Sequence, residues 1–372
     1  MDLSHEDTLR LNVLMANDIE AIRIDENRLI VYGLNGDKES RAPLSPNCRN
    51  DQYLKKVRAF LSGHVLGSPG GYPIFMRRWT RMGQARDSHL ADLLKLGEPE
   101  AVIAVASAAG LTNDLARRAW WIDPVSDNAR RMLQSGDVVK GSMGSVLVQH
   151  LVEHLPFETE AHAIIETVKL ILLSGLASEQ QKQQIWNKGQ HRRAYHIGFL
   201  AAAPDALLEV KPARHDFGEQ QTTLQALPDN AIAALLLRLL DGPGQTFLAA
   251  AESVLRRPTD QDEVIALLGA SSHYCRSAHL TEDKEQDIRK ILQQCAAMVA
   301  EARGEALAAV CQAVPGLHAE IRALIALAGC DEAVVTPIFT RTDAVGSVMR
   351  KKLQPVTDPV LEQFAILRGL KP

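Results

Sequence analysis

The sequence predicts a mainly α-helical protein with a small antiparallel β meander at its N-terminus. Short β-branched segments separated by turn residues occur between residues 19 and 44. From residue 51 onward, apolar residues recur at intervals of three and four, which is the spacing of one face of an α-helix. The helices are short and follow one another after brief breaks, so we expect an irregular HEAT-like or multi-helical array.

The N-terminal segment combines one helix with three strands. A capping-box pattern begins at Ser4 and predicts a helix over the following turns. Two β-branched segments, 19–25 and 28–34, predict a hairpin. An Asn-Gly turn signal directly after the second segment predicts a third strand in residues 38–44.

The rest of the chain is predicted as a series of helices. An apolar stripe in residues 53–61 marks the first of them. Capping residues or Pro stand at many of the predicted starts, and Gly or Pro at many of the ends. The further predicted helices span 87–96, 98–109, 112–120, 123–133, 146–155, 159–173, 178–186, 231–240, 245–256, 263–269, 281–302, 305–313, 318–328 and 332–339.

Composition divides the chain into three expected parts. Residues 1–46 form a helix and β meander packed on the helical body. Residues 47–210 form a helical domain that carries a Gly-rich loop and two basic-aromatic patches. Residues 211–372 form a C-terminal helical domain, because prolines and a polar Gln-Gln-Thr-Thr run interrupt the helical pattern near residue 210.

The charge balance excludes an overall nucleic-acid footprint. The 372 residues include 41 Lys and Arg against 45 Asp and Glu, which gives a formal net charge of −4. Any basic surface must therefore be local. Apolar runs such as 171–173 and 231–237 fall far short of the roughly 18 to 20 residues that span a bilayer. The N-terminus also lacks a secretory signal pattern, so we expect a cytoplasmic protein that does not enter a membrane.

The cysteines do not form a disulfide framework. The sequence contains five of them and no C-x-x-C motif, so we expect reduced thiols. Cys295, Cys311 and Cys330 lie in Ala-, Leu- and Val-rich helical segments, where a cysteine acts as a small buried apolar residue.

A glycine-rich loop and its basic exit form the first candidate site. Four glycines and two prolines fall between Gly63 and Pro73, so this backbone is neither regular helix nor strand. Successive backbone N–H groups of such a loop can cradle an anion, and the arginines that follow can close over it. The loop matches neither nucleotide-binding glycine motif, and the alternative is a structural loop whose arginines pair with acidic helix starts. The candidate residues are His64, Gly70, Gly71, Arg77, Arg78, Trp79 and Arg81.

A second basic-aromatic patch follows in residues 188–196. Clustered Lys and Arg bind phosphates, and aromatic rings stack on single-stranded bases, so the two patches together could bind RNA or an acidic protein. The alternative is an ordinary solvated face. The candidate residues are Lys188, Arg192, Arg193 and Tyr195.

The segment His150-Leu-Val-Glu-His154 matches the inverted zinc-protease motif H-x-x-E-H. On a helix, His150 and His154 lie one turn apart and could hold Zn²⁺, while Glu153 could activate a bound water. A zinc site needs a third ligand, however, and Pro156 ends the helix. The alternative is that both imidazoles pack at a helix contact, and we expect no metal and no cofactor.

A weaker metal-ligand pattern occurs at residues 273–279. His273, Cys275 and His279 lie within seven residues in a segment predicted as a polar break between helices. Their spacing is not one that structural metal sites commonly use, so an exposed turn is the favoured interpretation.

Several of these segments resemble the sulfur reduction protein DsrS family. The similar segments are G-H-V-L-G-S-P-G-G-Y-P at 63–73, R-W-T-R-M-G-Q at 78–84, L-L-K-L-G-E-P-E-A-V at 93–102, A-R-R-A-W-W at 116–121, D-T-L-R-L-N-V-L at 7–14, and I-W-N-K-G with Y-H-I-G-F-L within 185–200.

The resemblance implies a cytoplasmic accessory protein of the reverse-acting dissimilatory sulfite reductase system of sulfur-oxidising bacteria. It brings no catalytic residues, so the expected role is non-enzymatic and regulatory, through recognition of a protein of that system or of a ligand. Two other functions stay open: an RNA-binding post-transcriptional regulator of the same pathway, and a zinc-dependent hydrolase that uses His150, Glu153 and His154.

Overall fold

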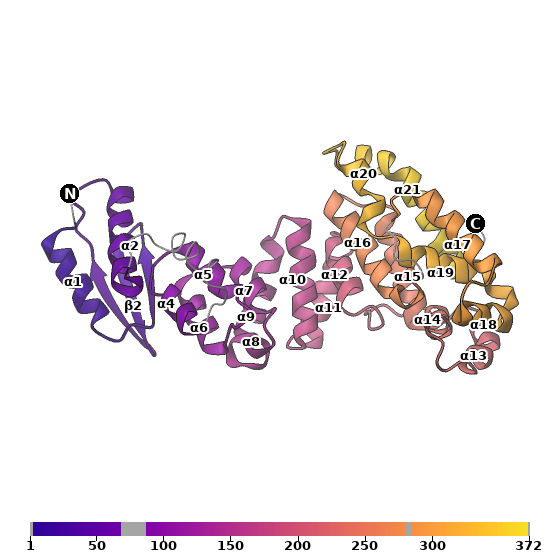
Figure 1. The fold of residues 1–372 in the computed structure, drawn as a ribbon, viewed down its shortest axis with the longest axis horizontal. Helices are drawn as coiled ribbons and strands as arrows, with labels where there is room; N and C mark the ends of the chain where they lie inside the picture. The colour runs from indigo at the N-terminus through magenta and orange to yellow at the C-terminus, as the bar shows by residue number, and fades with distance from the viewer. Residues whose placement is uncertain (1–2, 68–86, 280–284, 371–372) are drawn as a thin grey trace. The chain divides into compact units, whose positions relative to one another are not determined.

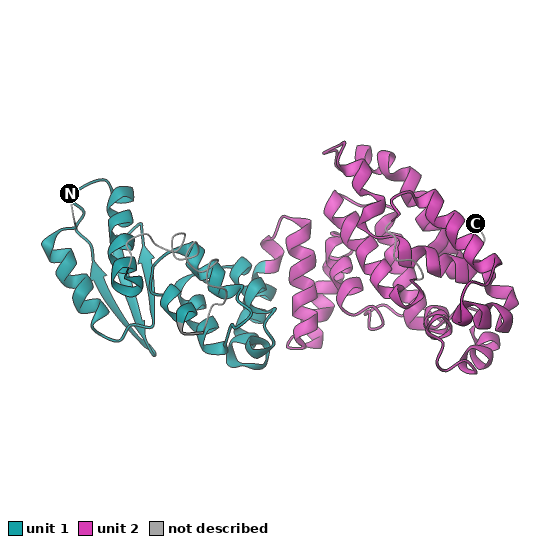
Figure 2. Cartoon of the chain, viewed as in Figure 1, with its two compact units in different colours: residues 1–154 teal, residues 155–372 magenta. Residues whose placement is uncertain are grey.

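A computed structural model describes residues 3–67, 87–279 and 285–370 (Figure 1). It is mainly helical and has a three-stranded antiparallel sheet near the N-terminus, which confirms the predicted fold class. The HEAT-like arrangement of the helices stays a prediction. The chain separates into two compact units, residues 1–154 and 155–372 (Figure 2). The three-part division with a boundary near residue 210 also stays a prediction.

The sheet in unit 1 has the order β1-β2-β3, formed by β1 (Ala21–Asp25), β2 (Ile30–Asn35) and β3 (Lys38–Pro43). Val31 stands opposite Ile24 on one side and Ala42 on the other. The turn between β2 and β3 contains Gly36 at a φ of +58°, the left-handed conformation that the Asn-Gly signal predicts. The predicted meander is therefore confirmed.

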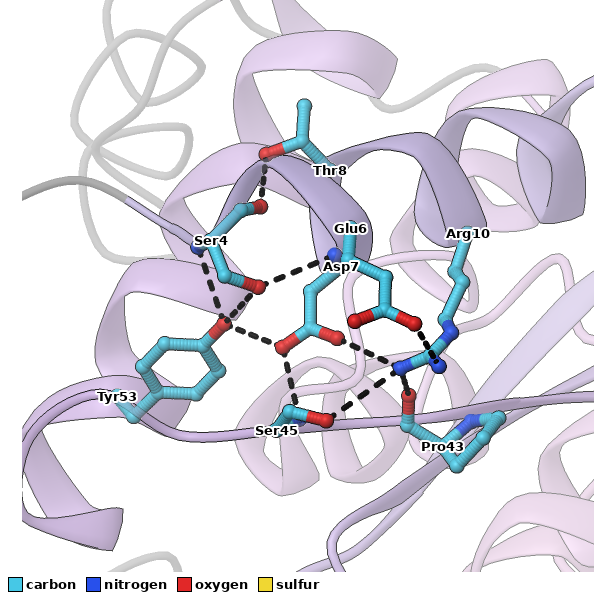
Figure 3. A network of polar contacts seen from close by, with 8 residues as sticks. All are labelled: Ser4, Glu6, Asp7, Thr8, Arg10, Pro43, Ser45 and Tyr53. Atoms are coloured by element: carbon cyan, nitrogen blue, oxygen red, sulfur yellow. Dashed lines mark hydrogen bonds and ion pairs between the residues drawn. The ribbon is translucent and has the colours of Figure 1, made fainter.

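A buried carboxylate holds the first helix against the sheet and the next helix (Figure 3). Asp7 lies in α1 (His5–Met15) and is fully buried. Its Oδ2 accepts hydrogen bonds from Tyr53 Oη at 2.5 Å and from the backbone N–H of Ser45 at 2.8 Å. Its Oδ1 accepts one from Arg10 Nη1 at 3.1 Å. Burial disfavours the charge, but these bonds outweigh it and lower the pKa of Asp7 below its ordinary value.

The helices that follow the sheet in unit 1 contact it through α6, which packs against β1. Arg23 of β1 lies over the ring of Trp121, 4.7 Å from its centroid, and forms an ion pair with Glu39 of β3 at 3.1 Å. Trp121 Nε1 also donates to Glu39 Oε2 at 3.2 Å. The helices are α2 (Asn50–Leu66), α4 (Asp87–Leu93), α5 (Pro99–Ala106), α6 (Asn113–Ile122), α7 (Ser126–Met132), α8 (Gly136–Lys140) and α9 (Ser142–His154).

Unit 2 is built from helices and short 3₁₀ turns in the part of the chain that the structure describes. Its α-helices are α10 (Ala161–Ser174), α11 (Glu179–Lys188), α12 (Ala194–Ala202), α13 (Phe217–Gln225), α14 (Ala231–Leu240), α15 (Gly242–Leu255), α16 (Gln261–Tyr274), α17 (Ile288–Ala300), α18 (Glu305–Ala313), α19 (His318–Gly329), α20 (Thr336–Phe339) and α21 (Gly346–Leu367). The 3₁₀ turns are η1 (Leu155–Phe157), η2 (Arg276–Ala278), η3 (Pro315–Leu317) and η4 (Glu332–Val334).

The long helix α21 has no counterpart among the predicted helices. It contains Pro355 and Pro359, each of which removes a helix hydrogen bond and costs about 3 kcal/mol in a helix interior. One face of the helix is nevertheless buried at helical spacing, from Met349 through Phe364 to Leu367. Packing of this apolar face against α15 and α19 offsets the local cost.

No single helix of the described chain is both long enough and apolar enough to cross a membrane. Helix α18 together with residues 315–329 meets the length and composition criteria, but the two segments are bent by 106° relative to each other. Ile321, Leu324 and Leu327 of α19 are buried in the core of unit 2.

Candidate functional site

The structure describes only one residue of the first candidate site. His64 lies exposed in the last turn of α2 and stacks on Phe60, with 6.4 Å between the ring centroids. The other candidates, Gly70, Gly71, Arg77, Arg78, Trp79 and Arg81, lie outside the described residues.

The second basic patch joins helix beginnings in unit 2. Arg192 donates to the carbonyl oxygens of Glu158 and Thr159, just before α10. Arg193 donates to the carbonyl of Arg257, in the connection between α15 and α16, at 3.2 Å. Tyr195 is buried and donates from its hydroxyl to the carbonyl of Leu155 at 3.2 Å. Lys188 is exposed at the end of α11. The two arginines therefore bond to backbone carbonyls of the segments between helices, and the buried tyrosine ring is not a surface stacking platform.

In the H-x-x-E-H segment the two histidine rings contact each other, whereas the glutamate side chain bonds to a different residue. The imidazoles of His150 and His154 stack with 3.8 Å between centroids, and His154 Nδ1 bonds to the carbonyl of His150 at 2.9 Å. Glu153 accepts from Gln149 Nε2 at 2.6 Å. Within the described ranges, no three His, Cys, Asp or Glu side chains are placed to hold a metal ion.

His150 also contacts two residues that the sequence did not indicate. Its Nε2 lies 3.3 Å from Ser126 Oγ, and its ring meets the edge of Trp120 at 4.8 Å between centroids. Burial lowers the pKa of His150, the nearby His154 lowers it further, and Glu153 opposes the shift. A neutral His150 packed among aromatic groups is the arrangement expected of a helix contact.

The 273–279 segment does not gather its three metal-ligating residue types at one point. His273 lies in the last turn of α16 and is exposed, so the helix runs past the predicted end at residue 269. Cys275 is fully buried, and burial raises the pKa of its thiol to about 12. His279 is exposed after the 3₁₀ turn η2.

A cavity of about 690 Å³ lies in unit 2 where α10, α12, α14 and α16 meet. Its lining combines apolar and small side chains with three basic ones. The lining residues are Ile165, Lys169, Leu173, Leu200, Ala201, Ala202, Pro204, Arg238, Ala266, Gly269, Ala270, His273 and Tyr274.

The cavity exists because its walls carry small residues. Ala201 and Ala202 end α12, while Ala266, Gly269 and Ala270 face the space from α16. A Cβ placed on Gly269 would meet no atom within 4 Å, so the space beside the helix is open. Larger side chains at these positions would fill it.

Three helices that run in the same direction surround the cavity. The bonds from Arg192 and Arg193 tie the beginning of α12 to the segment before α10 and to the connection between α15 and α16. Residues from the second half of each helix, Leu173, Leu200 and His273 among them, line the cavity. Ile165 and Ala266, from the first halves of α10 and α16, line it as well, so these two helices run along the cavity, while α12 ends at it.

The basic side chains reach the cavity from three different helices. Lys169 comes from α10, Arg238 from α14 and His273 from α16. The side chains of Lys169 and His273 are exposed and have no hydrogen-bond or ion-pair partner among the described residues. We call Lys169, Arg238 and His273 the basic triad.

Arg238 is held in place by Tyr274 and Asp205. Its guanidinium carbon lies 4.0 Å from the Tyr274 ring centroid, and Nη2 donates to the Tyr274 carbonyl at 2.8 Å. Its Nη1 lies 3.6 Å from a carboxylate oxygen of Asp205, which also accepts from the Tyr274 hydroxyl at 2.5 Å. Burial raises the pKa of Tyr274 far above its ordinary value, so this hydroxyl stays a donor.

A second hollow of about 310 Å³ continues the cavity toward the beginnings of α10 and α16. The two share Ile165, Lys169 and Ala266. The continuation is lined further by His162, Glu166, Asp262 and Ile265, of which His162 and Asp262 lie at its far end and Glu166 lies one helical turn before Lys169. We call the two hollows together the α10–α16 groove.

The sequence did not predict that Lys169, Arg238 and His273 form one site. Lys169 stands between Ile165 and Leu173 at intervals of four, an apolar helix stripe broken by one lysine, and that break is a signal visible in the sequence. Arg238 and His273 carry no such signal, because their shared location depends on how distant helices pack. Comparison with family models, with curated proteins and with solved structures found no match to this chain.

Proposed function

We propose that this protein acts by recognition, and that the α10–α16 groove is its ligand-binding site. One observation carries this proposal: basic side chains from three helices converge on a single hollow whose remaining walls are small or apolar. Binding sites for small molecules typically enclose about 300 to 1,000 Å³ and combine apolar walls with a few convergent polar groups. The cavity volume of about 690 Å³ falls in that range.

A neutral fluorescent probe tests whether the groove binds ligands at all. N-phenyl-1-naphthylamine emits strongly only in apolar surroundings, and we expect saturable binding to the purified full chain. Ala266→Leu and Gly269→Leu place bulk in the cavity and should reduce the binding at least several-fold. Ala300→Leu, at an exposed position at the end of α17, is the matched control and should bind as the wild type does.

Two outcomes would contradict the assignment of the α10–α16 groove as a ligand-binding site. If the probe does not bind the wild type, or if the cavity-filling variants bind it unchanged while they keep the wild-type melting temperature, the groove is not a ligand site.

We further propose that this recognition serves cytoplasmic dissimilatory sulfur oxidation, in a non-enzymatic accessory role. The support is the resemblance to the DsrS family in segments between residues 7 and 200. The expected partner is a protein of that system. The RNA-binding regulator and the zinc-dependent hydrolase stay predictions from sequence.

Affinity purification of the tagged full chain from a sulfur-oxidising bacterium tests this pathway assignment. A co-purifying sulfite reductase subunit or sulfur carrier protein, retained in a reciprocal purification, is the expected result. Recovery of intact bait without either protein, in cells that oxidise sulfur, would contradict the assignment.

A further inference from the structure

We infer that the α10–α16 groove binds an elongated amphipathic organic monoanion, with its acid group at the basic triad and its apolar body along the groove. This inference rests on the proposed function and specifies its ligand. It follows from the charges at the two ends of the groove, from its apolar walls and from its length.

The basic triad supplies the binding end for an acid group. Lys169 has no partner among the described side chains, so its ammonium group can donate to a ligand without breaking an existing bond. Arg238 is fixed in place by the Tyr274 carbonyl and ring, so little rotamer freedom is lost when it meets an anion. His273 adds a third polar group from the opposite helix.

Negative charges of three origins oppose an anion at this end: Asp205, Glu166 one turn before Lys169, and the C-terminal ends of the helices. Asp205 offsets part of the charge of Arg238, with which it pairs at 3.6 Å. The C-terminal ends of α10, α12 and α16 each carry about half a negative charge, but this effect is confined to the last turn. Lys169 lies more than one turn before Ser174, where α10 ends, so its charge is not needed to balance that helix end.

The walls of the groove suit an apolar body. Leu173 is 59% exposed at the mouth of the cavity, although large apolar side chains gain free energy when they are covered. Ile165 and Ala266 line both hollows, and Ile265 extends the apolar surface beyond them. A ligand body lying along Ile165, Ala266 and Ile265 would remain in apolar contact, while Leu173, one turn after Lys169, borders the end of the cavity that holds the acid group.

The length of the groove and the charges along it indicate how long the ligand is and how many acid groups it carries. Residues 262 to 273 of α16 border it, which corresponds to about 16 Å along the helix axis. A decyl chain fits this span. Asp262 at the far end and Glu166, one helical turn before Lys169, would oppose a second acid group, so the groove should select a monoanion over a dianion of the same length.

Calorimetry with four ten-carbon probes, each below its micelle concentration, tests this inference on the full chain. Decane-1-sulfonate and decanoate should bind, and the stronger of the two identifies the preferred acid group. Decyltrimethylammonium, with the same tail and the opposite charge, should bind at least about tenfold more weakly. Decanedioate should also bind more weakly than decanoate, because its second carboxylate meets Glu166 and Asp262.

Charge-removing variants locate the acid group. Lys169→Gln should weaken decane-1-sulfonate binding about fivefold, the effect of losing one exposed ion pair of about 1 kcal/mol. Lys188→Gln removes the same charge from another exposed position of unit 2 and should leave the affinity unchanged. Lys169→Arg keeps the charge and should retain most of the binding.

Three results would overturn the inference: equal or tighter binding of decyltrimethylammonium, equal binding of decanedioate and decanoate, or equal losses in Lys169→Gln and Lys188→Gln. With the neutral naphthylamine probe still bound in the groove, these results would leave the proposed function standing. If neither the neutral probe nor the decyl probes bind, both the inference and the proposed function fail.

Discussion

The guanidinium carbon of Arg238 lies 4.0 Å from the ring centroid of Tyr274, and the same arginine donates to the Tyr274 backbone carbonyl at 2.8 Å. This double contact ties α14 to the last turn of α16 at the wall of the cavity. It uses the planar guanidinium group as well as its charge, which distinguishes it from an ordinary surface ion pair.

We expect Arg238→Lys to lower the free energy of unfolding by about 1 kcal/mol, because lysine keeps the charge but loses the planar stacking group and the fixed donor geometry. Urea unfolding measures the change. Arg289→Lys, at an exposed position of α17, is the control and should be neutral. Equal stabilities of Arg238→Lys and wild type would show that the stacking contributes nothing.

Asp7→Asn should lower the free energy of unfolding of unit 1 by about 2 kcal/mol, because the fully buried carboxylate accepts bonds from Tyr53, Ser45 and Arg10. The pKa of Asp7 is lowered in the folded state, so its contribution is complete above the unfolded pKa and is lost as the pH falls through the folded value. Melting curves from pH 7 down to about pH 2 should therefore show a constant difference between the variant and the wild type above the ordinary Asp pKa and a shrinking difference below it. A difference that does not shrink in acid would contradict this account.

Glu263 should show the opposite pH dependence. It is buried, and burial raises its pKa, against the hydrogen bond that its carboxylate accepts from the backbone N–H of Thr259 at 2.7 Å. The folded state therefore favours the protonated form, so this group's contribution to stability grows as the pH falls from neutrality through the raised folded pKa. Glu263→Gln keeps an acceptor for Thr259 and removes the charge.

We expect Glu263→Gln to melt higher than the wild type at pH 7.5, with the difference shrinking at pH 5. Asp262→Asn, at the exposed neighbouring position of α16, serves as the control for removing a carboxylate from unit 2. A wild-type melting temperature above that of Glu263→Gln at pH 7.5 would refute the proposed cost of the buried charge.

Arg192→Gln should lower the melting temperature, because the carbonyls of Glu158 and Thr159 lose a charged donor. The free energy of unfolding should fall by about 0.5 to 1.5 kcal/mol, the net contribution of a typical hydrogen bond, because water can reach the Thr159 carbonyl. Lys188→Gln should leave the melting temperature unchanged. Salt-dependent RNA retention that disappears in Arg192→Gln without a loss of stability would instead support the RNA-binding function.

Added zinc should leave the melting temperature unchanged, because the His150 and His154 rings stack and Glu153 bonds to Gln149. Metal analysis of the purified full chain provides the second measurement. Near-stoichiometric zinc that is lost in His150→Gln would support the hydrolase function.

Local sequence signals predicted the elements whose boundaries they control. The predicted helices 231–240 and 305–313 coincide with α14 and α18, since capping residues, turn residues and helical spacing act within a few positions of each other. The sheet and the left-handed Gly36 were predicted for the same reason. Helix α21 was not, because its two prolines dominate the local signal while its burial against α15 and α19 depends on contacts distant in sequence.

By itself, the sequence determined that this protein is mainly helical, that it begins with a small meander, and that Cys295, Cys311 and Cys330 are buried apolar residues. Only the tertiary structure decided which basic groups meet. Arg192 and Arg193 bond to carbonyls of the segments between helices, whereas Lys169, Arg238 and His273 meet at one hollow. The physical reason is that helical spacing is a property of neighbouring residues. A cavity, by contrast, depends on side-chain size where helices distant in sequence pack together.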